Sequence, residues 1–211
     1  SGGQDHRWLG NGYFKKLGAQ IIASEDAVTD QKARTQDQFF ILGNLVGDQG
    51  IRGTDAVYAE TTFKEQFDFK KGDTIFNIRH SGQAHTPGDS FIWLPQMKVM
   101  FTGDIVYVER MLGVGAQSNS KTWIDAFQAM ATYNPEYLIP GHGETTNLSQ
   151  AKKDTYDYLV FLRQSVFDFM ENGGDLTEIS RVDQSKFDYL LNYENLSGRN
   201  AQQVFTEIEW E

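Results

Sequence analysis

HSGQAHTPGDSFIWLPQMKVMFTGD, the sequence of residues 80–104, decides the fold of this chain. Within it, Phe91–Leu94 and Lys98–Phe101 are short apolar runs bounded by Pro, Gly and Asp, a pattern that predicts two neighbouring buried strands. His85 lies in the loop before the first run, and Asp104 lies just past the second. If the two strands form a hairpin, His85 and Asp104 meet at the same edge of a sheet. Ligands for a metal ion would converge at that edge.

A third potential ligand follows another short apolar run. Tyr137–Ile139 is followed by the sequence PGHG at residues 140–143, which places His142 directly after a predicted strand. The flanking glycines have no side chain and therefore let the backbone approach an ion closely. Three strand ends thus offer two imidazoles and one carboxylate, from His85, Asp104 and His142.

The motifs AHTPGD at residues 84–89, FTGD at 101–104 and PGHG at 140–143 stand in the order found in the metallo-β-lactamase superfamily, which the chain resembles. Residues 198–205, GRNAQQVF, look like the closing helix of a hydrolase-like branch, so the resemblance covers nearly the whole chain. Aspartate at position 104, where zinc β-lactamases carry cysteine, makes the chain more similar to glyoxalase II-like hydrolases.

The resemblance implies an α/β fold, a metallo-β-lactamase-like αββα sandwich, with residues 1–211 forming a single domain. Members of the family normally have several strands ahead of their first metal motif, whereas this chain begins at that motif. We therefore expect an N-terminally incomplete sandwich, the C-terminal two-thirds or more of the usual fold. Because an uncovered sheet edge or apolar face favours association, we also expect a homodimer.

The first metal motif of the family, His-x-His-x-Asp-His, falls on the amino end of the chain. Asp5 and His6 match its last two positions, but Ser1 and Gly3 stand where the first two histidines belong. The spacing also differs, because three residues separate His6 from Gly10 where two are common. The first three residues read like the remnant of a cloning vector, and an upstream signal removed from the chain is an alternative.

The resemblance assigns Asp5, His6, Asp104 and His142 to a second metal, and His85 to a first metal that shares Asp104. It also implies that Asp5 orients the attacking hydroxide, which makes Asp5 the expected catalytic residue. Without the two missing histidines, the first site is expected to be weak. Oxygen and imidazole ligands without thiolate suit zinc, and also iron or manganese. We therefore expect one or two Zn²⁺ per chain.

The composition is that of a folded, acidic protein. Hydrophobic residues make up 39% of the chain, which favours a packed globule over disorder. The net charge of −10 argues against nucleic acid or an anionic membrane as the main partner and leaves small neutral or cationic substrates open. The absence of cysteine removes disulfides and thiolate zinc sites. No run approaches the roughly 18 apolar residues of a membrane span, so we expect a cytoplasmic or periplasmic protein.

The rest of the chain is predicted to form the helices and strands that support the site. Its patterns predict helices over Glu25–Leu45, over Ser120–Ala131, and from Asn147 or Ser149 to Asn172, together with two strands around a turn at residues 71–73. Residues 47–58 read as a loop. His80 is expected to be structural or to support a ligand, and Asp89 is expected to cap a turn. Trp8, Trp93 and Tyr107 are candidates for the border of a pocket.

The function that follows is a metal-dependent hydrolase in which metal-bound hydroxide attacks an ester, thioester, lactone or amide carbonyl of a small-molecule substrate. One alternative is a non-catalytic or regulatory metal-binding domain with a degenerate first site. Another is a di-iron domain for electron transfer or oxygen reduction. Native residues at positions 1 and 3 favour the regulatory alternative, whereas histidines at those two positions favour the enzyme.

Overall fold

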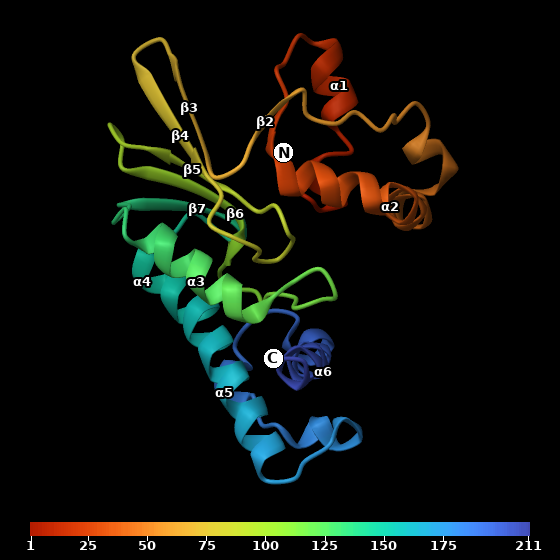
Figure 1. The fold of residues 1–211 in the computed structure, drawn as a ribbon, viewed down its shortest axis with the longest axis vertical. Helices are drawn as coiled ribbons and strands as arrows, with labels where there is room; N and C mark the ends of the chain where they lie inside the picture. The colour runs from red at the N-terminus through yellow and green to blue at the C-terminus, as the bar shows by residue number, and fades with distance from the viewer.

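The computed structural model describes residues 1–211, and its main feature is a five-stranded mixed sheet (Figure 1). The strands lie in chain order: β3 (Gln66–Lys71), β4 (Thr74–Arg79), β5 (Phe91–Leu94), β6 (Val99–Tyr107) and β7 (Tyr137–His142). Neighbouring strands from β3 to β6 are antiparallel, and β6 and β7 are parallel. The mixed α/β class predicted from the sequence is confirmed.

The predicted hairpin is present. Ile92 pairs with Phe101 and Leu94 pairs with Val99, so the start of β5 and the far part of β6 lie at the same end of the sheet. One expectation was wrong: Asp104 does not follow the strand, because β6 continues to Tyr107. The strand passes through Gly103 with a positive φ of 51°, a conformation that glycine adopts without strain, and the pairing with β7 shifts register there.

Helices cover one side of this sheet (Figure 1). They are α3 (Ser120–Ala131), α4 (Leu148–Ala151), the π-helical turn η2 (Lys152–Tyr156), α5 (Asp157–Glu171) and α6 (Tyr193–Glu209), with short 3₁₀ turns η3 (Leu176–Arg181) and η4 (Ser185–Phe187) before α6. Asn119 and Asn147 cap α3 and α4 by accepting hydrogen bonds from backbone N–H groups of the first turn. The predicted helix after Asn147 is therefore confirmed, with the π-helical turn inside it.

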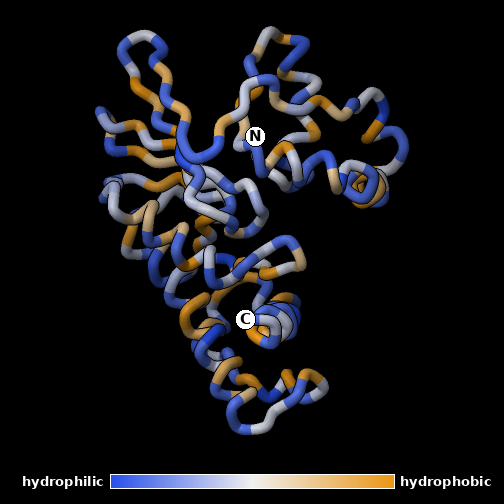
Figure 2. The backbone as a smooth tube through the Cα atoms, in the orientation of Figure 1, coloured by the Kyte–Doolittle hydropathy of each residue, from blue (hydrophilic) through white to orange (hydrophobic).

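The core lies between the sheet and these helices. Its cluster of 27 buried residues includes Met100 and Ile105 of β6, Trp123 of α3 and Leu162 of α5. Alternating apolar residues along the strands and helices are visible in Figure 2. The indole N–H of Trp123 donates to the carbonyl of Ile105 over 2.9 Å, which satisfies the polar end of a fully buried ring.

The amino-terminal part lies beside the sheet and contains η1 (Asp5–Arg7), α1 (Asn11–Lys16), β1 (Ile22–Ser24), α2 (Glu25–Ile51) and β2 (Thr61–Phe63). Strands β1 and β2 form a separate parallel pair. The expected loop over residues 47–58 was partly wrong, because α2 continues to Ile51 across a kink at Gly47. Ser24 caps α2 and donates to the carbonyl of Gly88 over 2.8 Å, which joins this part to the loop before β5.

No helix combines the length and apolar character that a membrane crossing requires. Large apolar side chains are exposed on α1, just after it and on α2, at Tyr13, Phe14, Leu17, Phe40, Ile41, Leu45 and Val46. Exposed apolar side chains on neighbouring helices are the kind of surface through which a homodimer would form. The homodimer stays a prediction.

Candidate metal centre

Three predicted ligands converge at one end of the sheet. Ligand atoms of His6, Asp104 and His142 all lie within 4.8 Å of one another. Nε2 of His6 is 3.6 Å from Oδ2 of Asp104, and Nε2 of His142 is 3.7 Å from Oδ1 of the same carboxylate. The two imidazoles therefore face the two oxygens of a single buried carboxylate.

The sheet supplies two of these residues through the parallel pairing of β6 and β7. Gly103 pairs with Pro140 and Tyr107 pairs with His142, so Asp104 and the end of β7 are neighbours. Gly141 has to be glycine, since a Cβ atom there would overlap the Asp104 carboxylate and the backbone of Gly103. The third residue, His6, comes from the 3₁₀ turn η1 of the amino-terminal part.

Arg7 holds the Asp104 carboxylate from the protein side. Its Nη1 lies 2.9 Å from Oδ1 of Asp89 and 3.5 Å from Oδ2 of Asp104. Burial acts to raise the pKa of Asp104, but the hydrogen bond from His6 and the charges of Arg7 and His85 outweigh it and hold that pKa well below its usual range. Asp104 is therefore ionised in a buried position.

Asp89 has the predicted turn role and a second one. It accepts hydrogen bonds from the backbone N–H and the hydroxyl of Thr86, at 2.7 and 2.9 Å. It is also the nearer ion-pair partner of Arg7. The loop that carries His85 is thereby tied to the residue that follows His6.

Asp5 orients the ring of His6. Oδ1 of Asp5 accepts from the backbone N–H of His6 over 2.7 Å and from Nδ1 of the ring over 3.2 Å. With a proton on Nδ1, neutral His6 presents a bare Nε2 to the cluster. The hydrogen bond with Asp104 raises the pKa of His6, against the effect of burial. Below that pKa, a cation must therefore displace a proton from Nε2 of His6 before it binds.

His142 is held by two groups that sequence reasoning did not assign to it. Its ring stacks on Tyr107 with centroids 4.5 Å apart, and Arg110 Nη1 donates to its Nδ1 over 3.0 Å. An arginine only donates, so neutral His142 carries its proton on Nε2 in this arrangement. Burial is the main cause that lowers the pKa of His142. Binding of a cation at Nε2 requires the proton to leave that atom.

His85 and Asp5 lie outside the group of three. Nδ1 of His85 donates to the carbonyl of Gly113 over 3.0 Å, and the ring lies against Tyr107 and Trp123. Because a carbonyl only accepts, Nε2 of His85 is bare. This is the arrangement in which a metal-binding histidine donates through its other nitrogen. The assignments of His85 and Asp5 as metal ligands stay predictions.

The donor set of the three-residue cluster fits a divalent cation. Ligands about 2.1 Å from a tetrahedral ion lie roughly 3.4 Å apart, close to the spacings around Asp104. Imidazole is a donor of intermediate hardness and carboxylate is a hard donor, and this combination suits zinc, iron or manganese. A bound cation would have to change the tautomer of His142 and, below the pKa of His6, displace the proton on Nε2 of that ring.

The positions of the two missing histidines are packed differently. Gly3 is buried, and a Cβ atom there would overlap the carboxylate of Asp30 and come within 2.9 Å of the Thr86 hydroxyl. Arg34 and Gln38 donate to the Gly3 carbonyl at 3.2 and 2.9 Å. A histidine at position 3 would therefore have to displace Asp30 and Thr86.

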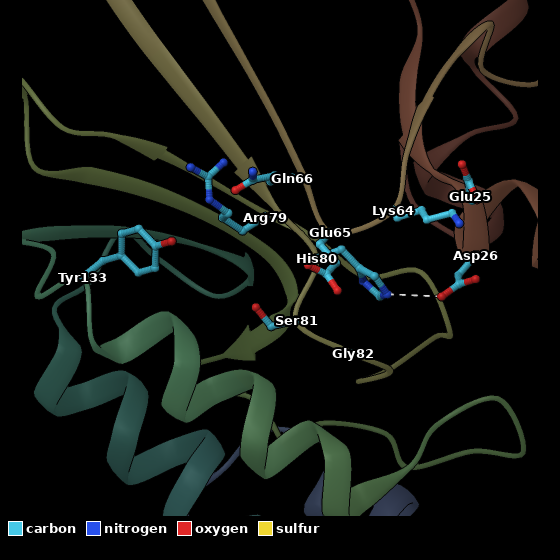
Figure 3. A pocket seen from close by; sticks show the side chains of 10 residues that line it. All are labelled: Glu25, Asp26, Lys64, Glu65, Gln66, Arg79, His80, Ser81, Gly82 and Tyr133. Atoms are coloured by element: carbon cyan, nitrogen blue, oxygen red, sulfur yellow. Dashed lines mark ion pairs between the residues drawn. The ribbon is translucent and has the colours of Figure 1, made fainter.

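His80 does not join the cluster. Its Nδ1 donates to the carbonyl of Asp89 over 2.7 Å, and its Nε2 lies 3.3 Å from Asp26. Figure 3 shows this pair at one side of a polar cavity of about 730 Å³ between the start of α2 and the sheet. Trp8 is buried and stacks on Tyr58 instead of bordering a pocket.

Arg7 and Arg110 are the functional candidates that sequence reasoning missed. Their only sequence signal is proximity to a motif, because Arg7 follows His6 and Arg110 lies in the segment after Asp104. Nothing in the sequence shows that either guanidinium contacts a cluster residue.

Comparisons with known proteins show the family of this chain and structures with a similar fold. A family model described as the metallo-beta-lactamase superfamily matches residues 5–142. The structure of a metallo-beta-lactamase from Pontibacter korlensis is similar, with a TM-score of 0.53 and 22% identity over 72% of this chain and 62% of that chain. The structure of the DIM-1 metallo-beta-lactamase has a TM-score of 0.55 and 19% sequence identity, over 72% of this chain and 62% of that chain. The structure of the inverting sec-alkylsulfatase Pisa1 from Pseudomonas sp. has a TM-score of 0.67 and 18% sequence identity, over 91% of this chain and 37% of that chain. The chain spans less than two-thirds of each of these structures.

Proposed function

Because the chain belongs to the metallo-β-lactamase superfamily, we propose that it is a hydrolase with one tightly held divalent cation at His6, Asp104 and His142. The observation that carries the proposal is the convergence of these three ligand atoms within 4.8 Å. A bound cation would supply Lewis-acid polarisation of a substrate oxygen and would lower the pKa of a water molecule.

The residues around the cluster have separate roles in this proposal. Asp104 supplies the negative charge that offsets the cation, and Arg7 fixes the direction of its carboxylate. Asp5 fixes the ring of His6 through Oδ1, which leaves its other oxygen, Oδ2, without a partner inside the protein. The resemblance implies that Asp5 orients the attacking hydroxide, and Oδ2 is the oxygen of Asp5 that is free to accept a hydrogen bond from it.

His85 extends the site toward the loop that follows β6. Its bare Nε2 is a further ligand, either for the same cation or for a second, weaker one. With Gly3 packed against Asp30, no other imidazole supports a second cation on that side. We therefore expect close to one tightly held zinc ion per chain, with a second held weakly or not at all.

Substrates are ester, thioester, lactone or amide bonds of small molecules. We add sulfate esters to these candidate substrates because the alkylsulfatase shares the fold over most of the chain. The alternative function, a metal-binding domain without turnover, is favoured by the same packing around Gly3 that weakens the first site.

The experiment combines metal analysis with turnover. The zinc-loaded protein is dialysed, its zinc is counted by elemental analysis, and it is then assayed with an aryl acetate, a thioester, a γ-lactone and a secondary alkyl sulfate. We expect close to one zinc per chain and hydrolysis of at least one substrate. Asp104→Asn should lose most of one equivalent of zinc together with the activity, because it removes the charge that offsets the cation.

A matched control is His80→Asn, which removes a histidine outside the cluster while its amide still donates to the carbonyl of Asp89. This variant should keep both the zinc and the activity. One zinc per chain without turnover of any substrate would support the non-catalytic alternative. Unchanged zinc content in Asp104→Asn would show that the cation is held elsewhere.

A further inference from the structure

A recess of about 180 Å³ begins at His85 and runs between the loop Gly113–Ser118 and helix α6. Gln4, the residue before Asp5, also lines it, so the recess adjoins the proposed metal centre. It is smaller than the roughly 300 Å³ at which typical ligand pockets begin, so it would accept an end group and not a whole molecule.

The recess is preformed by hydrogen bonds. The buried side chain of Asn200 accepts from the N–H of Val114 over 2.8 Å and donates to the carbonyl of Leu112 over 2.8 Å. Ser118 donates to the carbonyl of His85 over 3.0 Å and accepts from the N–H of Gly115 over 3.0 Å. The loop is thus tied both to α6 and to the candidate ligand His85.

The charge in the recess is opposite to that of the protein. The chain carries 29 acidic and 19 basic residues, yet none of the 10 residues that line the recess is Asp or Glu. Arg199 is the one arginine or lysine among them. A neighbouring hollow of about 460 Å³ shares Arg199, which is its only charged residue.

Arg199 has no carboxylate partner. The arginines that form ion pairs are Arg7, Arg34, Arg79, Arg163 and Arg181. Arg199 is exposed on α6, and its guanidinium is free to donate to an oxyanion. A net charge of −10 repels anions at long range, so any attraction to them must be local to such a recess.

We propose that this recess binds a carboxylate or sulfate group of the substrate through Arg199 and thereby selects anionic substrates. The proposal rests on the hydrolase function proposed above and names the substrate class of that site. It also replaces the expectation of neutral or cationic substrates from the net charge. Arg199 is a specificity-determining residue and takes no part in the bond cleavage.

The test is an equilibrium titration of the zinc-loaded protein followed by NMR. The probes are propionate, methyl sulfate and the neutral propionamide. We expect both anions to shift the backbone amide signals of Gly115 and Asn200 in a saturable way, whereas propionamide leaves them in place. Tighter binding of one anion supports the proposal and identifies whether the recess prefers carboxylate or sulfate.

Three variants assign the effect to Arg199. Arg199→Gln should weaken anion binding about threefold to fivefold, the upper part of the range for an exposed ion pair, and Arg199→Lys should retain most of the affinity. Arg52→Gln, which removes another exposed arginine without an ion pair, is the matched control and should bind like the unaltered protein. In kinetics, Arg199→Gln should lower kcat/KM for an anionic ester relative to a neutral one.

Two results would overturn the proposal. One is equal anion affinity in Arg199→Gln and the unaltered protein, and the other is a set of shifts confined to His6 and His142, which places the anion at the cation. Failure of the hydrolase function is a separate result, because the titration does not depend on turnover. Conversely, turnover combined with either result would overturn this inference alone.

Discussion

The guanidinium of Arg110 donates to Nδ1 of His142 over 3.0 Å, and this contact places the proton of the neutral imidazole on Nε2, the atom that faces Asp104. The proposed ligand His142 therefore has a positive charge beside it, and its ligand atom Nε2 carries a proton that opposes cation binding. Nε of Arg110 is itself buried without a partner. Arg110 is thus positioned to restrain cation binding until its contact with His142 is released.

Replacement of Arg110 with glutamine is the direct test of that relationship. Glutamine removes the charge, and its carbonyl oxygen accepts a hydrogen bond from Nδ1, which favours the tautomer with a bare Nε2. Changes to the partner of a ligating histidine commonly alter metal affinity about 10-fold or more, so we expect zinc to bind about tenfold tighter. Competition with a chromophoric chelator measures the affinity, and equal affinities in Arg110→Gln and Arg52→Gln would contradict the restraint.

Zinc affinity should fall at low pH through His6. The pKa of His6 is raised above its usual value of 6.5, mainly by Asp104, and the pKa of His142 is lowered. Between the two pKa values, cation binding therefore releases a proton from His6, whereas His142 is already neutral. We expect the affinity to rise about tenfold per pH unit up to the pKa of His6 and then to level off. A flat profile between pH 6 and pH 8 would be inconsistent with this order of titration.

The metal-free protein should lose stability in acid through Asp104. Its pKa is lowered in the folded state, so its contribution to stability is present above the unfolded value near 3.9 and is lost as the pH falls toward the folded value. Asp104→Asn lacks this contribution at every pH. Urea unfolding of both proteins should therefore show a gap in the free energy of unfolding at pH 5 that narrows as the pH falls from about 4 toward 2. A constant gap would mean that Asp104 contributes through its shape and not its charge.

Thr155, in the π-helical turn η2, holds the end of β6 in place. Its hydroxyl donates to the carbonyl of Tyr107 over 2.6 Å and accepts from the N–H of Tyr107 over 3.0 Å. Thr155→Val leaves both buried backbone groups without a partner, which should cost about 1–3 kcal/mol of the free energy of unfolding. Because Tyr107 stacks on His142, zinc binding should weaken as well.

Thr29→Val is the matched control for Thr155→Val. The hydroxyl of Thr29 donates to the carbonyl of Glu25 on the exposed side of α2, where water replaces it. Thr29→Val should change the free energy of unfolding by no more than about 0.5 kcal/mol. If both variants lose the same free energy of unfolding, the loss of a threonine hydroxyl from a helix, and not the link to Tyr107, explains the effect.

Local patterns in the sequence predict the strands that carry the site. Short apolar runs punctuated by Pro, Gly and Asp fix the hairpin of β5 and β6 and the strand that ends at His142, because burial and turn chemistry are local properties. The same patterns located α3 and the cap at Asn147. The motifs also contain His6, Asp104 and His142, whose ligand atoms converge in the structure.

The tertiary structure alone decided which of these residues meet and what holds them. The extension of β6 past Asp104 depends on pairing with β7, which lies more than thirty residues further along the chain. The contacts of Arg7 with Asp89 and Asp104, of Arg110 with His142, and of Asn200 with Val114 join segments with no common local pattern. Long flexible side chains reach their partners only after the backbone is folded, so neither the tautomers of the histidines nor the charge of the recess beside His85 follows from the sequence.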